Sequence, residues 1–111
     1  MPATPLPGRP ARGSHSGRSI MALLDLLGRR WTLRVIWELR DAEPQTFRDL
    51  QLHSGDVSSS VLSTRLRELA EAGLVTHAGS GYVLTDHGVS LLEQLLPLDA
   101  WAKTWAAELV D

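Results

Sequence analysis

The sequence predicts a mainly α-helical fold with one small β-hairpin. Three observations lead to this prediction, and all of them lie between residues 46 and 84. Two stretches with leucines at helical spacing are each preceded by a Ser or Thr that can cap the first helical turn. A short turn that contains Gly55 separates them, and two short strand-like stretches follow. Two helices, a turn and a hairpin in this order are typical of a winged helix-turn-helix.

The chain is predicted to hold one domain, residues 19–111, behind a flexible arm of residues 1–18. A length of 111 residues suits a single hydrophobic core. The arm contains four prolines, three glycines and three arginines, without helical periodicity. It therefore cannot bury enough apolar surface to offset the entropy lost on ordering. A solvated tail is the favoured interpretation of the arm, and a basic arm that contacts nucleic acid is the alternative.

Two helices are predicted between this arm and the helix-turn-helix. From Ser19 to Leu27 apolar residues recur at helical spacing until Gly28 interrupts them. From Thr32 to Arg40 apolar residues lie on two sides, so we expect this helix to be buried. It should end before Pro44, because the residue before a proline avoids the helical region.

The first helix of the helix-turn-helix is predicted to begin at Thr46, whose hydroxyl can cap the turn that ends at Asp49. The second is predicted to begin at Ser58 as its N-cap. Its leucines continue to Gly73, a residue suited to a left-handed C-terminal cap.

Strands are predicted at residues 75–77 and 82–84, joined by a loop of residues 78–81. Thr85 is then expected to cap a final helix rich in leucine. Pro97 lies within this helical pattern, and we expect it to kink or restart the helix.

Charge is distributed unevenly in a chain whose formal net charge is −2 at pH 7. Residues 1–19 hold three arginines and no acid, whereas residues 68–111 hold seven acids and one lysine. Between Thr46 and Arg67, three arginines and two aspartates give a net charge of +1. This segment therefore permits DNA binding of modest and salt-sensitive affinity.

Residues 58–72 are predicted to be a recognition helix that enters the DNA major groove. At 100° per residue its leucines face inward and small polar side chains face outward, where they can approach base edges and phosphates. The predicted DNA-contacting residues lie on both helices and in the wing: Thr46, Arg48, Ser58, Ser59, Ser60, Ser63, Thr64, Arg65, Arg67 and Ser80. The alternative for the two recognition-helix arginines is pairing with Glu68 and Glu71, which contributes only about 0.2–0.5 kcal/mol per exposed pair.

Three arginines also cluster beside Trp31, at positions 29, 30 and 34. Contact with DNA phosphates and pairing with Asp25, Glu38 or solvent are equally good interpretations of this cluster.

The C-terminal helix carries Trp101 and Trp105 one turn apart, which is more apolar surface than a tail helix needs. Packing within the chain is one interpretation, and packing against a second copy across a twofold axis is the preferred one. The predicted dimer interface combines the first and last helices through Ile20, Leu23, Leu24, Leu98, Trp101 and Trp105.

Several kinds of site are not expected. The chain has no cysteine, which excludes disulfides, thiolate zinc sites and thiol switches. Its four histidines are scattered without ligand or triad spacing, so we expect no metal site, no cofactor and no enzymatic activity. The apolar runs are too short to span a membrane, and no secretory signal is recognisable, so a soluble cytoplasmic protein is expected.

Four segments together resemble the HxlR-type winged-helix transcriptional regulators of bacteria. They are ALLDLLGRRWTLRVIWEL (22–39), TFRDL (46–50), VLSTRLRELAEAGLV (61–75) and YVLTDHG (82–88). The third pattern also occurs in MarR-like and PadR-like winged helices, and the GRRWTL stretch narrows the resemblance to the HxlR type.

The resemblance implies a homodimer that reads a palindromic operator and controls a nearby gene, with an unknown small-molecule effector as a further partner. Two departures limit it. Many relatives carry a sensing cysteine before the first helix, where this chain has about Arg18, and the wing here lacks the family's basic residues. The acidic balance and the uncharged wing also keep open a second interpretation, a winged-helix protein-interaction module without sequence-specific DNA binding.

Overall fold

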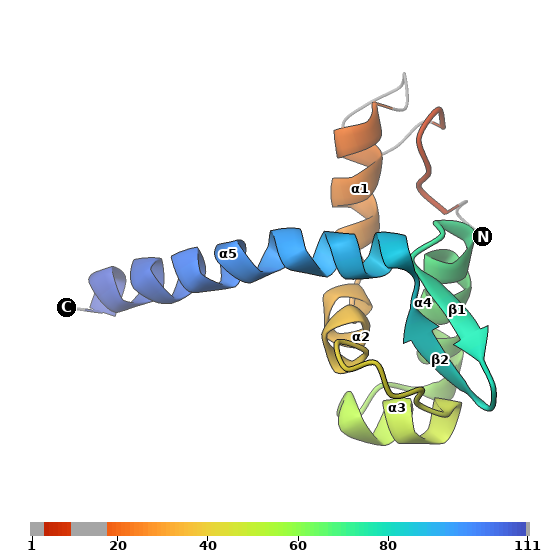
Figure 1. The fold of residues 1–111 in the computed structure, drawn as a ribbon. Helices are drawn as coiled ribbons and strands as arrows, with labels where there is room; N and C mark the ends of the chain where they lie inside the picture. Colours follow the sequence, from red (N-terminus) through yellow and green to blue (C-terminus); the bar gives the residue numbers. More distant parts are fainter. Residues whose placement is uncertain (1–3, 10–17, 111) are drawn as a thin grey trace.

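The structure is a computed structural model that describes residues 4–9 and 18–110. Within these residues it contains helices and one two-stranded antiparallel sheet, in the order that the sequence predicts (Figure 1). The elements are α1 (Ser19–Leu27), α2 (Thr32–Glu38), α3 (Phe47–His53), α4 (Ser59–Glu71), β1 (Val75–Ala78), β2 (Gly81–Leu84) and α5 (Asp86–Val110).

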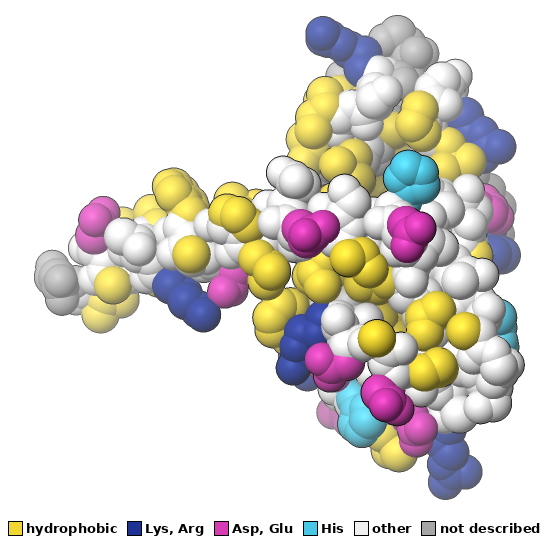
Figure 2. Space-filling view, viewed as in Figure 1, with side chains coloured by type: hydrophobic (Ala, Val, Ile, Leu, Met, Phe, Trp, Pro, Cys, Tyr) yellow, Lys and Arg dark blue, Asp and Glu magenta, His cyan; other side chains and the backbone are white. Residues whose placement is uncertain are grey.

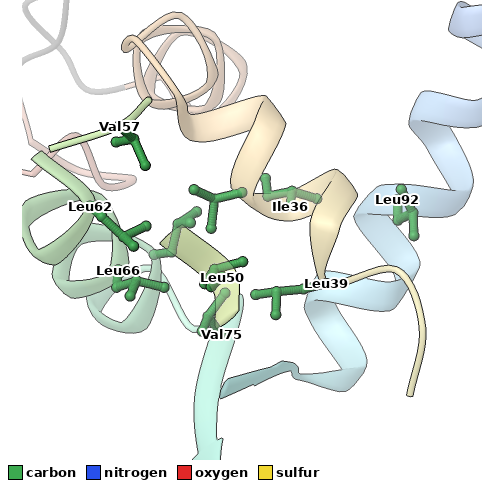
Figure 3. Packing of buried hydrophobic residues seen from close by; sticks show 10 residues of the cluster. Ile36, Leu39, Leu50, Val57, Leu62, Leu66, Val75 and Leu92 are labelled. Atoms are coloured by element: carbon green, nitrogen blue, oxygen red, sulfur yellow. The ribbon is translucent and has the colours of Figure 1, made fainter. Parts of the chain in front are cut away.

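Helix α2 lies at the centre of the fold and contacts α1, α3, α4 and α5. Val35 and Ile36 of α2, and Leu39 directly after it, are fully buried. The expected burial of this helix is confirmed for this side only, because Leu33 and Trp37 are exposed. Figure 3 shows how side chains from the other elements converge on α2. The remaining buried members of this core are Leu50, Val57, Leu62, Leu66, Leu69, Val75 and Leu92.

The helix starts are set by the predicted caps. Thr46 Oγ1 accepts a hydrogen bond of 3.1 Å from the amide of Asp49, and Ser58 Oγ accepts one of 3.2 Å from the amide of Val61. Gly73, just after α4, has a φ of +74°, the left-handed conformation that favours glycine. Three local signals in the sequence therefore position the helix-turn-helix correctly.

The hairpin turn is shorter than predicted. Each strand extends one residue further than expected, and Ala78 pairs with Gly81. The four-residue loop is therefore reduced to Gly79 and Ser80, and Gly79 adopts a φ of +62°. Gln45 adds a bridge to Tyr82 through two backbone hydrogen bonds of 3.1 and 2.7 Å.

Helix α5 does not restart at Pro97, contrary to that part of the prediction, because Asp86–Val110 forms one helix with Pro97 inside it. Its 25 residues span about 37 Å. The C-terminal half runs away from the body of the molecule (Figure 1), and Figure 2 shows hydrophobic side chains along it. None of the described helices is long and apolar enough to cross a membrane.

The arm predicted for residues 1–18 lies largely outside the described residues, so its flexibility stays a prediction. The described part, residues 4–9, borders a pocket whose other walls come from α1 and from the chain just after α4. Thr4 and Pro5 are buried there. Residues 4–6 therefore pack on the domain, whereas residues 7–9 are exposed.

The start of α5 is tied to the end of α4 by Thr85. Its hydroxyl donates to the Gly73 carbonyl at 2.6 Å and accepts from the Gly88 amide at 3.1 Å, as expected of a cap. Gly88 is buried so close to the chain after α4 that a Cβ at this position would overlap the carbonyl oxygen of Leu74.

Replacing Gly88 by alanine should therefore lower the free energy of unfolding by about 1–3 kcal/mol, because the backbone of Leu74 must shift. Urea denaturation followed by circular dichroism measures this loss. Ser90→Ala, an exposed change on the same helix, is the control and should leave the midpoint nearly unchanged. Equal midpoints for the two variants would contradict the close approach.

Candidate nucleic-acid interface

Helix α4 has a buried apolar side and an exposed polar side. Leu62, Leu66 and Leu69 are at most 4% exposed and anchor the helix in the core. Ser63 and Arg67 are exposed, and Thr64 is half-buried. Because the leucines fix the rotation of the helix about its axis, the polar side faces away from the core.

Three serines form the N-terminus of α4, and all are exposed. Ser58 is the cap, and its Oγ lies 3.3 Å from Ser60 Oγ. Gln51 of α3 donates through Nε2 to Ser59 Oγ at 3.1 Å and to the Val57 carbonyl at 3.2 Å. This amide links the two helices across their turn. Free amides at the start of a helix are suited to contact phosphate oxygens.

The other predicted contacts lie on α3 and on the hairpin. Arg48 is exposed on α3. The hydroxyl of Thr46 already accepts the capping hydrogen bond from the Asp49 amide. Ser80 is exposed at the tip of the hairpin, beyond the edge-to-face pair of His77 and Tyr82, whose ring centroids are 4.2 Å apart. The hairpin tip thus offers a hydroxyl and backbone amides to a partner.

Both pairings considered for the α4 arginines are present, and they differ in kind. Arg67 Nη1 lies 3.0 Å from Glu71 Oε1 in an exposed pair. The nearby Thr4 side chain and the pairing with Arg67 lower the pKa of Glu71 below its ordinary value. Arg65 instead pairs with Glu68, which is only 2% exposed. The sequence pattern indicated an exposed pair at both places and missed the burial of Glu68.

For the arginines beside Trp31, the structure favours pairing. Arg34 lies 3.1 Å from Glu38 and donates to the carbonyl of His53 at 3.1 Å. Arg29 pairs with Glu68 of α4. Arg30 places its guanidinium carbon 5.6 Å from the centre of the Trp31 ring.

The residues predicted for a dimer interface are largely uncovered in the single chain. Trp101 and Trp105 stack on each other at 5.8 Å and remain 61% and 51% exposed. Ile20, Leu24 and Leu98 are exposed, whereas Leu23 is half-buried. Packing of the two tryptophans into the body of the same chain, one of the two interpretations above, is therefore wrong.

A cavity of about 300 Å³ lies between α2 and α5. Its walls are apolar except for one carboxylate, that of Asp99. Nothing in the described residues tests a small-molecule effector, which stays a prediction.

A capped helix pair, a short turn and a hairpin, with a polar recognition helix exposed beside them, define a winged helix-turn-helix protein. Proteins of this class bind DNA through the second helix of the pair.

Comparison with known proteins identifies the family. Residues 26–109 match the HxlR-like helix-turn-helix family. The chain is 32% identical over 89 residues to YvaP of Bacillus subtilis, an uncharacterised HTH-type transcriptional regulator, covering 74% of this chain and 82% of YvaP. It is also 32% identical over 85 residues to BH0655 of Halalkalibacterium halodurans, an uncharacterised regulator of the same type, covering 70% and 75%. Quinone-bound YodB from B. subtilis superposes with a TM-score of 0.72 at 29% identity, covering 77% of this chain and 96% of that chain.

The chain belongs to the HxlR-like helix-turn-helix family. It is a transcriptional regulator of the helix-turn-helix type and not an enzyme.

Replacing Ser58 by alanine removes the cap of α4 and should lower the free energy of unfolding by about 1 kcal/mol. Ser63→Ala on the same exposed side should change it little, since alanine has the higher helix propensity. Chemical denaturation of both variants measures the difference. A loss no larger for Ser58→Ala than for Ser63→Ala would show that the hydroxyl does not stabilise the helix start.

Proposed function

We propose that this regulator acts as a homodimer that reads a palindromic operator, with α4 of each copy in a major groove. The single observation that carries the proposal is the polar side of α4, which stays exposed while its leucines are held in the core. Small hydroxyl side chains let the helix approach base edges closely. Arg67 adds the longer reach needed for a phosphate or a guanine.

The proposed contacts have different tasks. Backbone amides and hydroxyls at Ser58, Ser59 and Ser60 fix the helix on the phosphates, because contacts of this kind set register but carry no sequence information. Side chains further along the exposed side read bases. The residues proposed for this reading are Ser63 and Thr64, and Arg67 is proposed to contact a phosphate. Supporting backbone contacts come from Thr46 and Arg48 of α3 and from Ser80 of the hairpin.

Affinity should fall steeply with salt, and replacing Arg67 by alanine should lower the slope of log K against log salt by about 1. The reason is that one phosphate contact releases about one counterion. Fluorescence anisotropy with a duplex selected from a random pool measures this slope. Lys103→Ala is the control, since Lys103 lies on the projecting half of α5.

Binding with a flat salt response, or no binding at low salt, would contradict the proposed function. Such a result would favour the protein-interaction module as the role of this winged helix. An unchanged slope in Arg67→Ala would remove Arg67 alone from the proposed contacts.

A second copy is proposed to cover the projecting half of α5 together with α1. Leu98, Trp101 and Trp105 fall within one narrow stripe of the helix and are exposed. Exposed aromatic residues concentrated in this way are typical of interfaces. Twofold symmetry would set the two α4 helices about 34 Å apart, one turn of DNA.

Trp101→Glu should convert the dimer into a monomer, because a charge in an apolar interface is costly to bury. Sedimentation equilibrium measures the change in mass. Lys103→Glu is the matched control, since this residue lies on the other side of the same helix and should leave the dimer intact. Identical masses for the two variants would contradict the proposed interface.

A further inference from the structure

The most unusual charged residue of the described chain is Glu68, in the middle of α4. Its side chain is 3% exposed, although a carboxylate is rarely buried to this degree unless it is paired. Both of its oxygens are occupied. Oε1 pairs with Arg65, one turn earlier on α4, and Oε2 pairs with Arg29, in the turn between α1 and α2. We call Arg29, Arg65 and Glu68 the Glu68 cluster.

The guanidinium of Arg65 makes a further contact in the same place. Its Nε donates to the backbone carbonyl of Arg30 at 2.8 Å, so Arg65 binds the α1–α2 turn directly as well as through Glu68. The side chain of Arg65 is only 18% exposed. Its neighbour Arg67 is 46% exposed and pairs with Glu71 of its own helix. Arg65 is thus held against the α1–α2 turn, whereas Arg67, two residues later on α4, is open to solvent.

The turn that receives these contacts is itself strained. Trp31 has a φ of +77°, a conformation that costs a bulky residue free energy and persists only where its surroundings hold it. The far side of its ring borders Gly55, in the turn between α3 and α4. The α1–α2 turn is therefore held by α4 through the pairing of Arg29 with Glu68 and the hydrogen bond from Arg65 to the Arg30 carbonyl.

We propose that Glu68 is a positioning residue for DNA reading, which locks α4 to the α1–α2 turn and holds Arg65 away from the DNA. Its carboxylate pairs with the guanidinium groups of Arg29 and Arg65, which would otherwise be available to phosphates. The inference rests on the proposed function for the part that concerns DNA. It reassigns Arg65, which the sequence pattern placed among the DNA contacts, to the joint between α4 and the body of the domain.

The first test is a double-mutant cycle on the free energy of unfolding, with Glu68→Gln, Arg65→Met and the double variant. Removing the carboxylate leaves Arg65 without its counter-charge, and removing Arg65 leaves the buried Glu68 with Arg29 as its remaining partner, so the two changes are coupled. We expect a coupling of at least tenfold in the unfolding equilibrium constant. The matched control is Glu71→Gln with Arg67→Met, an exposed pair on the same helix, with an expected coupling of about twofold or less. Equal coupling energies for the two pairs would contradict the proposal that Glu68 locks α4 to the α1–α2 turn.

The second test measures DNA binding against salt at a temperature where circular dichroism shows each variant folded. Arg65→Met should leave the slope of log K against log salt unchanged, whereas Arg67→Ala should lower it by about 1. Glu68→Gln, which keeps both α4 arginines, should lose at least tenfold in preference for the selected operator over a scrambled duplex. A loss of stability alone does not produce this pattern in a folded protein.

A slope lowered by about 1 in Arg65→Met would overturn the inference, because Arg65 would then contact phosphate. An unchanged operator preference in Glu68→Gln would overturn the positioning role. If Glu68→Gln fails to fold, the salt slope of Arg65→Met still tests the inference. That variant is expected to fold, since Arg29 continues to pair with Glu68. A wild-type chain that binds no duplex overturns the proposed function and the DNA part of this inference. The double-mutant cycle alone then tests whether Glu68 locks α4 to the α1–α2 turn.

Discussion

The burial of α2 is the constraint on which the rest of the structure depends. Val35 and Ile36 of α2, and Leu39 directly after it, are each at most 1% exposed, and α2 contacts every other described helix. Burying a side chain of this size stabilises a fold by about 1.5–3 kcal/mol. Because α4 is fixed on this centre by its own leucines, its polar side has to point outward. The position of the recognition surface is thus a consequence of apolar packing on the opposite side of the same helix.

Much of the fold could be predicted because its signals are local. The hydroxyls of Thr46, Ser58 and Thr85 each cap the helix that follows, and Gly73 takes the left-handed conformation after α4. Each signal acts within about four residues of its own position, so a single sequence carries it completely. The exposed polar side of α4 follows from helical periodicity in the same way, whereas its contacts with DNA remain a prediction.

The features that the sequence did not indicate depend on distant residues or on solvent. Glu68 is buried because Arg29, 39 residues away, reaches it, and no spacing rule within α4 reports such a contact. Pro97 removes one amide donor, but it lies where α5 is exposed. Water can satisfy the carbonyl left without a partner there, so the helix continues. Sequence rules that consider only neighbouring residues fail at these two positions, because the outcome depends on Arg29 at Glu68 and on solvent at Pro97.

The charges of α4 also support the proposal that the protein acts as a dimer. Its two arginines are balanced by Glu68 and Glu71, so the helix has no net charge with which to attract phosphates. One copy therefore depends on amides, hydroxyls and the exposed Arg67, and such a set supplies modest affinity. Two linked copies bind the second half-site as an intramolecular event, which raises affinity without any new contact. A helix neutralised by its own carboxylates is thus better suited to act in pairs, which supports the proposed dimer and its proposed interface at the exposed tryptophans of α5.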